Sequence, residues 1–138
     1  MAAFNKFEVP MENLAEKVHD FDLDLLKIYL SNTAPVATNQ VKADIAEIAA
    51  GNGYTAGGAD ATAATSRTGG TLSVTGVDIT WTASGGSIGP FRYAILYNDT
   101  PTTPTDPLIG WWDYGSSITL NTGESFTVDL GTSLFTLV

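Results

Sequence analysis

Few residue types in this sequence could catalyse a reaction, and those present are not spaced for it. The chain has no Cys, and its one histidine, His19, lies far in sequence from the serine-rich turns. A Ser-His-Asp arrangement would have to use His19, but no G-x-S-x-G or comparable nucleophile motif occurs. With one His and no Cys, a zinc site would need carboxylates for nearly all of its ligands. We therefore expect no metal site and no cofactor, and we interpret His19 as a surface or packing residue.

The clusters of acidic residues and glycines also fit structural explanations. Asp20, Asp22 and Asp24 resemble the first three ligand positions of a calcium loop, but Leu25 stands where that loop needs Gly. No Glu follows at the twelfth position, so we predict an acidic turn before a strand. The glycines between positions 51 and 58 match neither a dinucleotide-binding nor a phosphate-binding motif. We interpret them as turn residues.

The aromatic residues could instead form a binding surface. Exposed Trp and Tyr rings bind sugars by stacking, and the candidates here are Trp81, Trp111, Trp112 and Tyr114. Because Trp111 and Trp112 are adjacent, they must point to opposite sides of a strand. We expect one of the two in the core and the other in a subunit interface or half-buried under a loop.

Length and charge limit the classes of partner. A chain of 138 residues fits one domain with a real hydrophobic core, and without Cys that core must hold by packing alone. Six basic and 15 acidic residues give a net charge of -9, which repels phosphate backbones and argues against a nucleic-acid partner. No apolar run is long enough for a signal peptide or a membrane span. In that setting the glycosylation sequon Asn98-Asp99-Thr100 indicates only a turn.

The N-terminal half of the chain mixes helical and extended patterns. Apolar residues at helical spacing predict a short amphipathic helix over residues 11–19, and period-two alternation predicts a strand over 26–30. Helical spacing recurs at Val41, Ile45 and Ile48 and predicts a second helix, ended by the following glycines. Residues 51–70 are mostly Gly, Ala, Thr and Asn, too poor in large apolar groups for core, and should form a long loop or an extended edge.

From residue 71 onward the pattern is that of β-structure. Turn signals recur every 8 to 15 residues, as expected of a sandwich or barrel. The strand over 91–98 has apolar residues on both faces and should be central, with Phe91, Tyr93, Ile95 and Tyr97 on one of them. Further strands are predicted over 71–75 and 77–82, with a turn at Gly76 between them, and over 108–115 and 133–138. A hairpin is predicted over 117–130 with its turn at 121–124.

These patterns predict the fold class and the division of the chain. We expect a mainly β fold, an antiparallel β-sandwich or barrel-like domain of about eight strands with a short N-terminal helix. Residues 1–24 should form an N-terminal arm with that helix. Residues 25–138 should form a single β-sandwich domain that carries the extended loop at 51–70.

Four segments in a fixed order resemble a known group of proteins. They are "NGYTAGG" (52–58), "WTASGGSIGPFRYAILYND" (81–99), "PLIGWWDYG" (107–115) and "LNTGESFTVDL" (120–130). Together they look like a widespread group of small tailed-bacteriophage and prophage virion proteins, which carry YTAGG-like, RYAVLYND-like and PLIGxxDFG-like segments and a closing hairpin. The resemblance spans residues 25–138.

That resemblance implies a structural role without catalytic residues. The matched positions are expected to serve as scaffold: Tyr54, Gly57 and Gly58 in a turn, Arg92, Tyr93 and Tyr97 on the central strand, and Trp112, Asp113 and Gly115 on the next.

The role that the resemblance favours is a capsid decoration (cement) protein. Such a protein would bind the outer capsid surface, assemble with it in the host cytoplasm, and stabilise contacts between major capsid subunits. A homotrimer is expected, because many decoration proteins sit at threefold points. We expect residues 1–24 and 51–70 to reach neighbouring subunits. The candidate partner residues are Trp111, Trp112, Tyr54, Phe4 and Phe7.

Two other classes of function stay open. One is a phage tail or head-tail component, or a host-glycan-binding module, that would use Trp111 or Trp112. The other is a small hydrolase that would use acidic residues such as Asp99 and Asp113.

Overall fold

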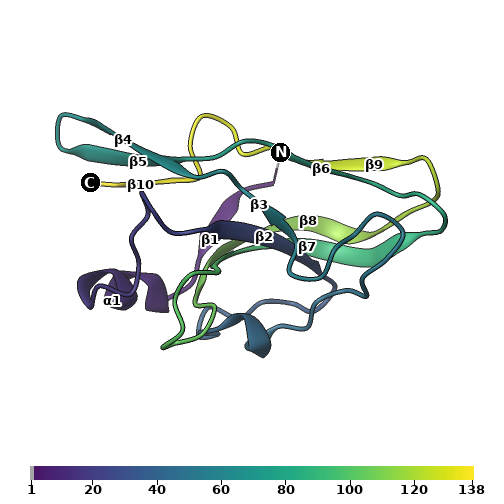
Figure 1. Ribbon diagram of the computed structural model, residues 1–138, viewed down its shortest axis with the longest axis horizontal. Coiled ribbons are helices and arrows are strands. Elements are labelled where there is room, and N and C mark those ends of the chain that lie inside the picture. Colours follow the sequence, from purple (N-terminus) through teal and green to yellow (C-terminus); the bar gives the residue numbers. More distant parts are fainter. Residues whose placement is uncertain (1) are drawn as a thin grey trace.

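The computed structural model describes residues 2–138 and shows a mainly β chain with sandwich-like antiparallel sheets (Figure 1). The helical segments are α1 (Val9–Ala15) and the 3-10 turn η1 (Lys42–Asp44). The strands are β1 (Phe4–Lys6), β2 (Leu26–Ser31), β3 (Ala59–Asp60), β4 (Ala64–Thr68), β5 (Thr71–Thr75), β6 (Ile79–Thr82), β7 (Ile88–Asn98), β8 (Leu108–Leu120), β9 (Ser125–Val128) and β10 (Phe135–Leu137).

The strands form two layers. One layer is a five-stranded sheet in the order β1-β8-β7-β2-β3. The other contains two smaller sheets, β10-β5-β4 and β6-β9, which lie together along one side of the larger sheet in Figure 1. This arrangement confirms the predicted mainly β, sandwich-like fold with one short N-terminal helix, although the described residues contain ten strands and not about eight.

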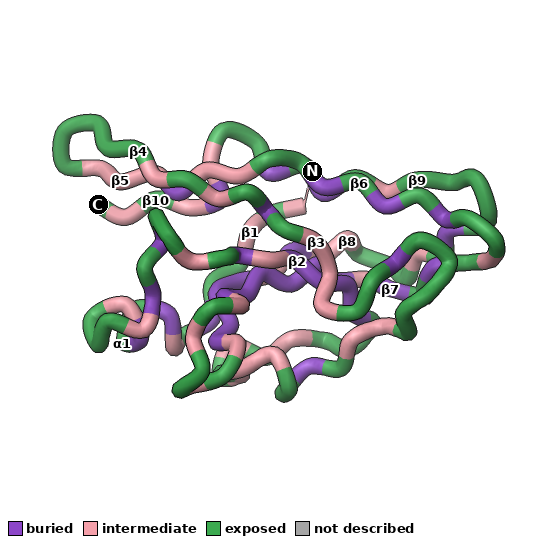
Figure 2. The backbone as a smooth tube through the Cα atoms, viewed as in Figure 1, coloured by how far each residue is buried: buried purple, intermediate pink, exposed green. Residues whose placement is uncertain are grey.

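The central strand is β7, as its pattern predicts. It pairs with β2 on one side and β8 on the other, and buried residues concentrate along these three strands (Figure 2). The ladder with β8 shifts register between Phe91 and Tyr93. Phe91 therefore joins the core between the layers, whereas Tyr93, Ile95 and Tyr97 point to the opposite face. The prediction that all four share one face is wrong, because a β-bulge reverses the alternation.

The five-stranded sheet has a core on each face. Between the layers, Ile28, Leu96 and Trp112 pack against residues of the smaller sheets, such as Val74 and Val128. On the other face, a second cluster of buried residues lies under the connecting segments: Phe7, Tyr29, Ile45, Tyr93, Ile95, Tyr97 and Leu108. The chain therefore covers both faces of its own central sheet.

Two predicted strand connections differ in the structure. The turn at residues 121–124 forms, with a hydrogen bond from Glu124 N–H to the Asn121 carbonyl (2.9 Å). The strands on either side of it do not pair with each other, because β8 belongs to the large sheet and β9 pairs with β6. The segment is a crossover between the layers and not a hairpin. In the same way, the turn at Gly76 leads from β5 in one sheet to β6 in another, and it leaves Val77 exposed.

The prediction of a second helix at Val41, Ile45 and Ile48 is wrong. Only the short turn η1 forms there. Ile45 is buried in the second cluster under the loops, whereas Ile48 packs against the core between the layers and donates its N–H to the Leu30 carbonyl (3.1 Å). One face of a helix cannot reach both cores, so tertiary packing overrides the helical spacing.

The N-terminal helix is shorter than predicted and begins earlier. It ends at Ala15, followed by Lys17 with a φ of 64°. The N–H of Val18 bonds the Asn13 carbonyl (2.8 Å) and that of Lys17 bonds the Leu14 carbonyl (3.2 Å). These are the two hydrogen bonds of a Schellman motif, which closes a helix through a left-handed residue.

Residues expected to form an arm and a loop are built into the sheets. In the first 24 residues, β1 pairs with β8, with Phe4 opposite Trp112 and Lys6 opposite Gly110. Gly110 is required at this position, because a Cβ there would overlap the Phe4 ring and the Asn5 carbonyl.

The segment 51–70 provides the edge strands β3 and β4. This confirms the extended edge, but Tyr54 and Ala61 are buried, so the expectation that the segment makes no core is wrong.

Candidate functional site

Three of the predicted partner residues are buried within the chain. Phe7 is 0% exposed, and Tyr54 and Trp112 are each 2% exposed. They cannot present a surface to another molecule in this conformation, and their burial corrects that part of the prediction. Phe4 and Trp111 remain partly exposed. As expected for adjacent strand residues, Trp112 enters the core while Trp111 lies half-buried on the opposite side, against the ring of Phe7 (4.5 Å between centroids).

His19 is a packing histidine, as the sequence indicates. Its ring stacks on Phe21 with a centroid separation of 5.0 Å, and its Nδ1 lies 3.0 Å from Asn98 Nδ2. Because the amide is a donor, Nδ1 accepts this hydrogen bond and the proton of the neutral ring sits on Nε2. Burial lowers the pKa of His19 to about 4, and the nearby charge of Asp24 offsets this only in part. Asn98 is itself buried and also donates to Asp24 (2.7 Å), so the formal sequon lies inside the fold.

The acidic segment 20–24 is a self-bonded turn. Asp20 Oδ1 accepts the N–H groups of Asp22 (3.1 Å) and Leu23 (3.2 Å), and Asp24 Oδ2 accepts the N–H of Asp20 (2.8 Å). Asp22 also accepts a hydrogen bond from the Thr65 hydroxyl on β4 (3.0 Å). Among the described residues, no group of three or more His, Asp or Glu side chains is placed to hold a metal ion.

Asp99 and Asp113 do not come together as a catalytic pair. Asp113 lies opposite Tyr93 and forms a two-point ion pair with Arg92 (2.8 and 3.1 Å), which holds the pKa of Asp113 below its usual range. Asp99 follows the end of β7 and pairs with Lys27 (3.5 Å). Six residues of extended chain from Tyr93 to Asp99 span about 20 Å. The two carboxyl groups of glycosidases lie within about 10 Å of each other, so this arrangement does not match that chemistry.

A partly buried polar cluster around Glu47 was not predicted from the sequence. Glu47 Oε2 accepts hydrogen bonds from the Tyr54 hydroxyl (2.7 Å) and the Gly57 N–H (2.7 Å), while Oε1 pairs with Lys42 Nζ (2.9 Å). Burial by itself would raise the pKa of Glu47, but these hydrogen bonds outweigh it and lower the pKa. The Tyr54 hydroxyl accepts the N–H of Leu30 on β2 (3.0 Å). The cluster fixes the turn at 51–58 against the central sheet, which is a structural task.

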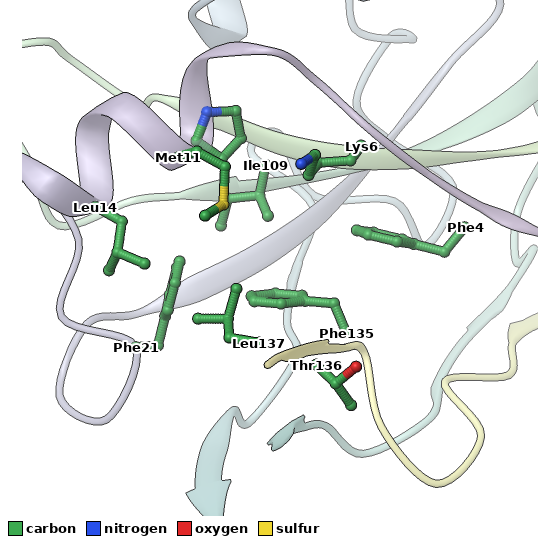
Figure 3. Close-up of a pocket in the computed structure, with 10 residues that line it drawn as sticks. Phe4, Lys6, Met11, Leu14, Phe21, Ile109, Phe135, Thr136 and Leu137 are labelled. Carbon is green, nitrogen blue, oxygen red and sulfur yellow. The ribbon is translucent and has the colours of Figure 1, made fainter. Parts of the chain in front are cut away.

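The surface best suited to binding is a groove beside α1, which we call the α1 groove (Figure 3). Its apolar lining includes Phe4, Met11, Leu14, Phe21, Ile109 and Phe135. The cavity measures about 90 Å³, which suits one aliphatic side chain and is far below the volume of a typical small-molecule pocket.

The floor of the α1 groove is a row of aromatic rings. Phe135 lies between Phe4 (6.0 Å) and Phe21 (5.1 Å), and Phe4 continues the row to Trp112 in the core (5.1 Å). Lys6 is the charged residue of the lining. Of the predicted partner residues, Phe4 is the one that the structure places in this groove. Met11 and Leu14 were predicted only as the apolar face of a helix, and the sequence shows no signal that Phe135 would meet them.

Comparison of the chain with family models, with curated proteins and with solved structures gives no match. Within residues 2–138, no helix has the length and apolar character needed to cross a membrane.

Proposed function

We propose that this chain is a bacteriophage virion structural protein, and within that class a capsid decoration protein. It would bind the outer capsid surface as a homotrimer and stabilise contacts between major capsid subunits. The observation that carries the proposal is the structural role of residues in the segments that resemble those of phage virion proteins. Tyr54, Gly58, Arg92 and Asp113 among them hold elements of the fold together, so a protein that shares the pattern should share this fold.

Those tasks are specific. Tyr54 joins Glu47 to β2 through its hydroxyl group. A Cβ on Gly58 would overlap the Ile28 carbonyl, so the turn can only approach β2 with glycine there. Arg92 and Asp113 join β7 to β8. These contacts support the scaffold role that the resemblance implies for the matched residues.

Charge and cysteine content support the same class. A net charge of -9 keeps a protein clear of packaged DNA, and the absence of Cys suits assembly in a reducing cytoplasm. Cementing means burying surface across the seams between capsid subunits, so that internal pressure must break these contacts before a seam opens. An interface of about 1,000 Å² per copy is enough, because the lattice repeats it.

The test is the copy number per particle in purified virions of the encoding phage. Quantitative mass spectrometry against the major capsid protein should give one copy, or a simple fraction of one copy, per capsid subunit. Particles that lack the protein should lose resistance to heat or low salt. A handful of copies per particle would contradict the decoration role, and absence from the particle would contradict any virion role.

A second candidate is a host-glycan-binding component of the tail. The half-buried Trp111 favours it, since part of its ring remains available for stacking on a sugar. This role predicts a signal on a glycan array that is lost in Trp111→Ala. An array without signal, together with a high copy number, would exclude the glycan-binding role and favour the decoration role.

A further inference from the structure

An occupant that fits the α1 groove would have an apolar group with a negative charge beside it. Its floor is the aromatic row of Phe4, Phe135 and Phe21, and Met11 points its thioether toward that floor (Figure 3). Lys6 is the charged member of the lining in a chain with 15 acidic residues and only six basic ones. A carboxylate next to the inserted apolar side chain would therefore find an ammonium partner at the groove.

The basic residue of the groove, Lys6, is available for such a partner. In the described part of the chain, Lys27, Lys42 and Arg92 each form an ion pair within 4 Å. Lys6, Lys17 and Arg67 form none there. Lys6 lines the groove, Lys17 follows α1, and Arg67 belongs to β4, at the same end of the sandwich in Figure 1.

One segment of this chain has the required chemistry. Leu23 is 80% exposed and stands between Asp22 and Asp24 in the turn at residues 20–24. Leu25, just beyond the turn, is also exposed. Burying the exposed side chain of Leu23 is favourable, and the carboxylate of Asp22 beside it matches Lys6 in charge.

The turn is also held rigid before any contact forms. The Asp20 side chain bonds the backbone of Asp22 and Leu23, and the Thr65 hydroxyl fixes Asp22 to β4. The N–H of Leu25 donates to the Thr100 hydroxyl (2.8 Å). Because the backbone around Leu23 is already ordered, inserting its side chain costs little conformational entropy.

We propose that the α1 groove binds the turn at residues 20–25 of a second copy of this chain, with Leu23 seated on the aromatic floor and the exposed carboxylate of Asp22 facing Lys6. Leu23 and Asp22 do not line the groove, although Phe21 of the same turn does, so each copy carries both a side chain to insert and a groove to receive one. When the two neighbours are different copies the contact is heterologous, and it closes into a ring where the rotation between copies allows it. The inference deepens the proposed function, since it describes how the trimer of the decoration protein would form, and it rests on that function only for the size of the ring.

The experiment uses the purified full chain and measures its mass over a range of concentrations by sedimentation velocity. The wild type should form a closed oligomer. Leu23→Ser removes the inserted side chain, and Met11→Glu places a carboxylate in the groove that repels Asp22 and Asp24. Each variant should weaken self-association at least tenfold, because a buried leucine or an opposed charge contributes that much.

Mixing the two variants is the decisive measurement. Leu23→Ser keeps an intact groove and Met11→Glu keeps an intact Leu23, so an equimolar mixture should form a one-to-one complex that neither variant forms alone. Val77→Ser is the matched control, since Val77 is also an exposed apolar residue (59%) but lies at the crossover between β5 and β6. It should associate like the wild type.

Three results would overturn the inference: a wild type that stays monomeric, equal weakening by Val77→Ser and Leu23→Ser, or a mixture that does not pair. A monomer that still binds capsids, and loses that binding in Met11→Glu, would assign the groove to the capsid protein instead. That outcome would refute self-docking but leave the proposed function standing. A ring that forms normally while the protein is absent from virions would support self-docking but refute the proposed function.

Discussion

Removing the hydroxyl group of Tyr54 should destabilise the domain far more than the loss of one oxygen atom suggests. In Tyr54→Phe, the buried N–H of Leu30 loses its acceptor and Glu47 Oε2 loses one of its donors. A buried polar group left without its partner costs about 1–3 kcal/mol. We expect the free energy of unfolding to fall by about 2–4 kcal/mol, a large part of the roughly 5–15 kcal/mol typical of a domain.

Urea denaturation measures this change directly. The midpoint should fall while the m-value stays constant, and the melting temperature should drop by about 10 °C for a chain of this length. Tyr114→Phe is the matched control, because it removes a hydroxyl from a partly exposed ring on β8 and should change the stability by less than about 0.5 kcal/mol. If Tyr54→Phe were as stable as this control, the Glu47 cluster would not hold the turn to the sheet as we argue.

Two further substitutions test the turn glycine and the buried histidine. Gly58→Ala must place a Cβ against the Ile28 carbonyl at a φ of +80°, so it should cost about 2–4 kcal/mol in denaturant unfolding. Gly69→Ala, at a φ of +59° in open space, should cost only about 1 kcal/mol, and equal costs would refute the clash. Because burial lowers the pKa of His19 from 6.5 to about 4, the unfolded chain binds a proton below pH 6.5 that the folded chain does not. The wild type should therefore lose up to about 1.4 kcal/mol per pH unit as the pH falls from 6.5 toward 4, relative to His19→Gln, and parallel pH profiles of the two proteins would contradict this.

The central part of the fold could be predicted because its signal is local. A strand covered on both faces must be apolar on both faces, and residues 91–98 have this pattern without any knowledge of their neighbours. The adjacent tryptophans are equally informative, since alternation along a strand forces Trp111 and Trp112 apart whatever the sheet order is. The packing role of His19 followed from the lack of a nucleophile motif and of any Cys or second His that could share a metal.

The remaining features depend on contacts between distant residues. The turn at 121–124 has the residues of a hairpin, but its local chemistry does not specify which sheet the next strand joins. The spacing of Ile45 and Ile48 is helical, yet the two side chains enter cores on opposite faces of one sheet. The α1 groove combines Phe4, Phe21 and Phe135 from three distant segments. No periodicity within a single segment could indicate such a surface.

The arrangement of the cores restricts where a partner can bind. One face of the five-stranded sheet is covered by the smaller sheets and the other by the chain's own connecting segments. Outside the core, β6 and β9 present hydroxyl groups that bond each other, Thr80 to Thr127 and Thr82 to Ser125, each at 2.7 Å. A face of paired hydroxyls gains little from contact with a protein, because its hydrogen bonds are already made. Among the described residues, the end of the sandwich that carries the α1 groove and Leu23 combines an apolar groove with an exposed apolar side chain, so a contact there would gain most from apolar burial. A decoration protein built in this way would meet its neighbours through that end and leave its polar strands toward the solvent.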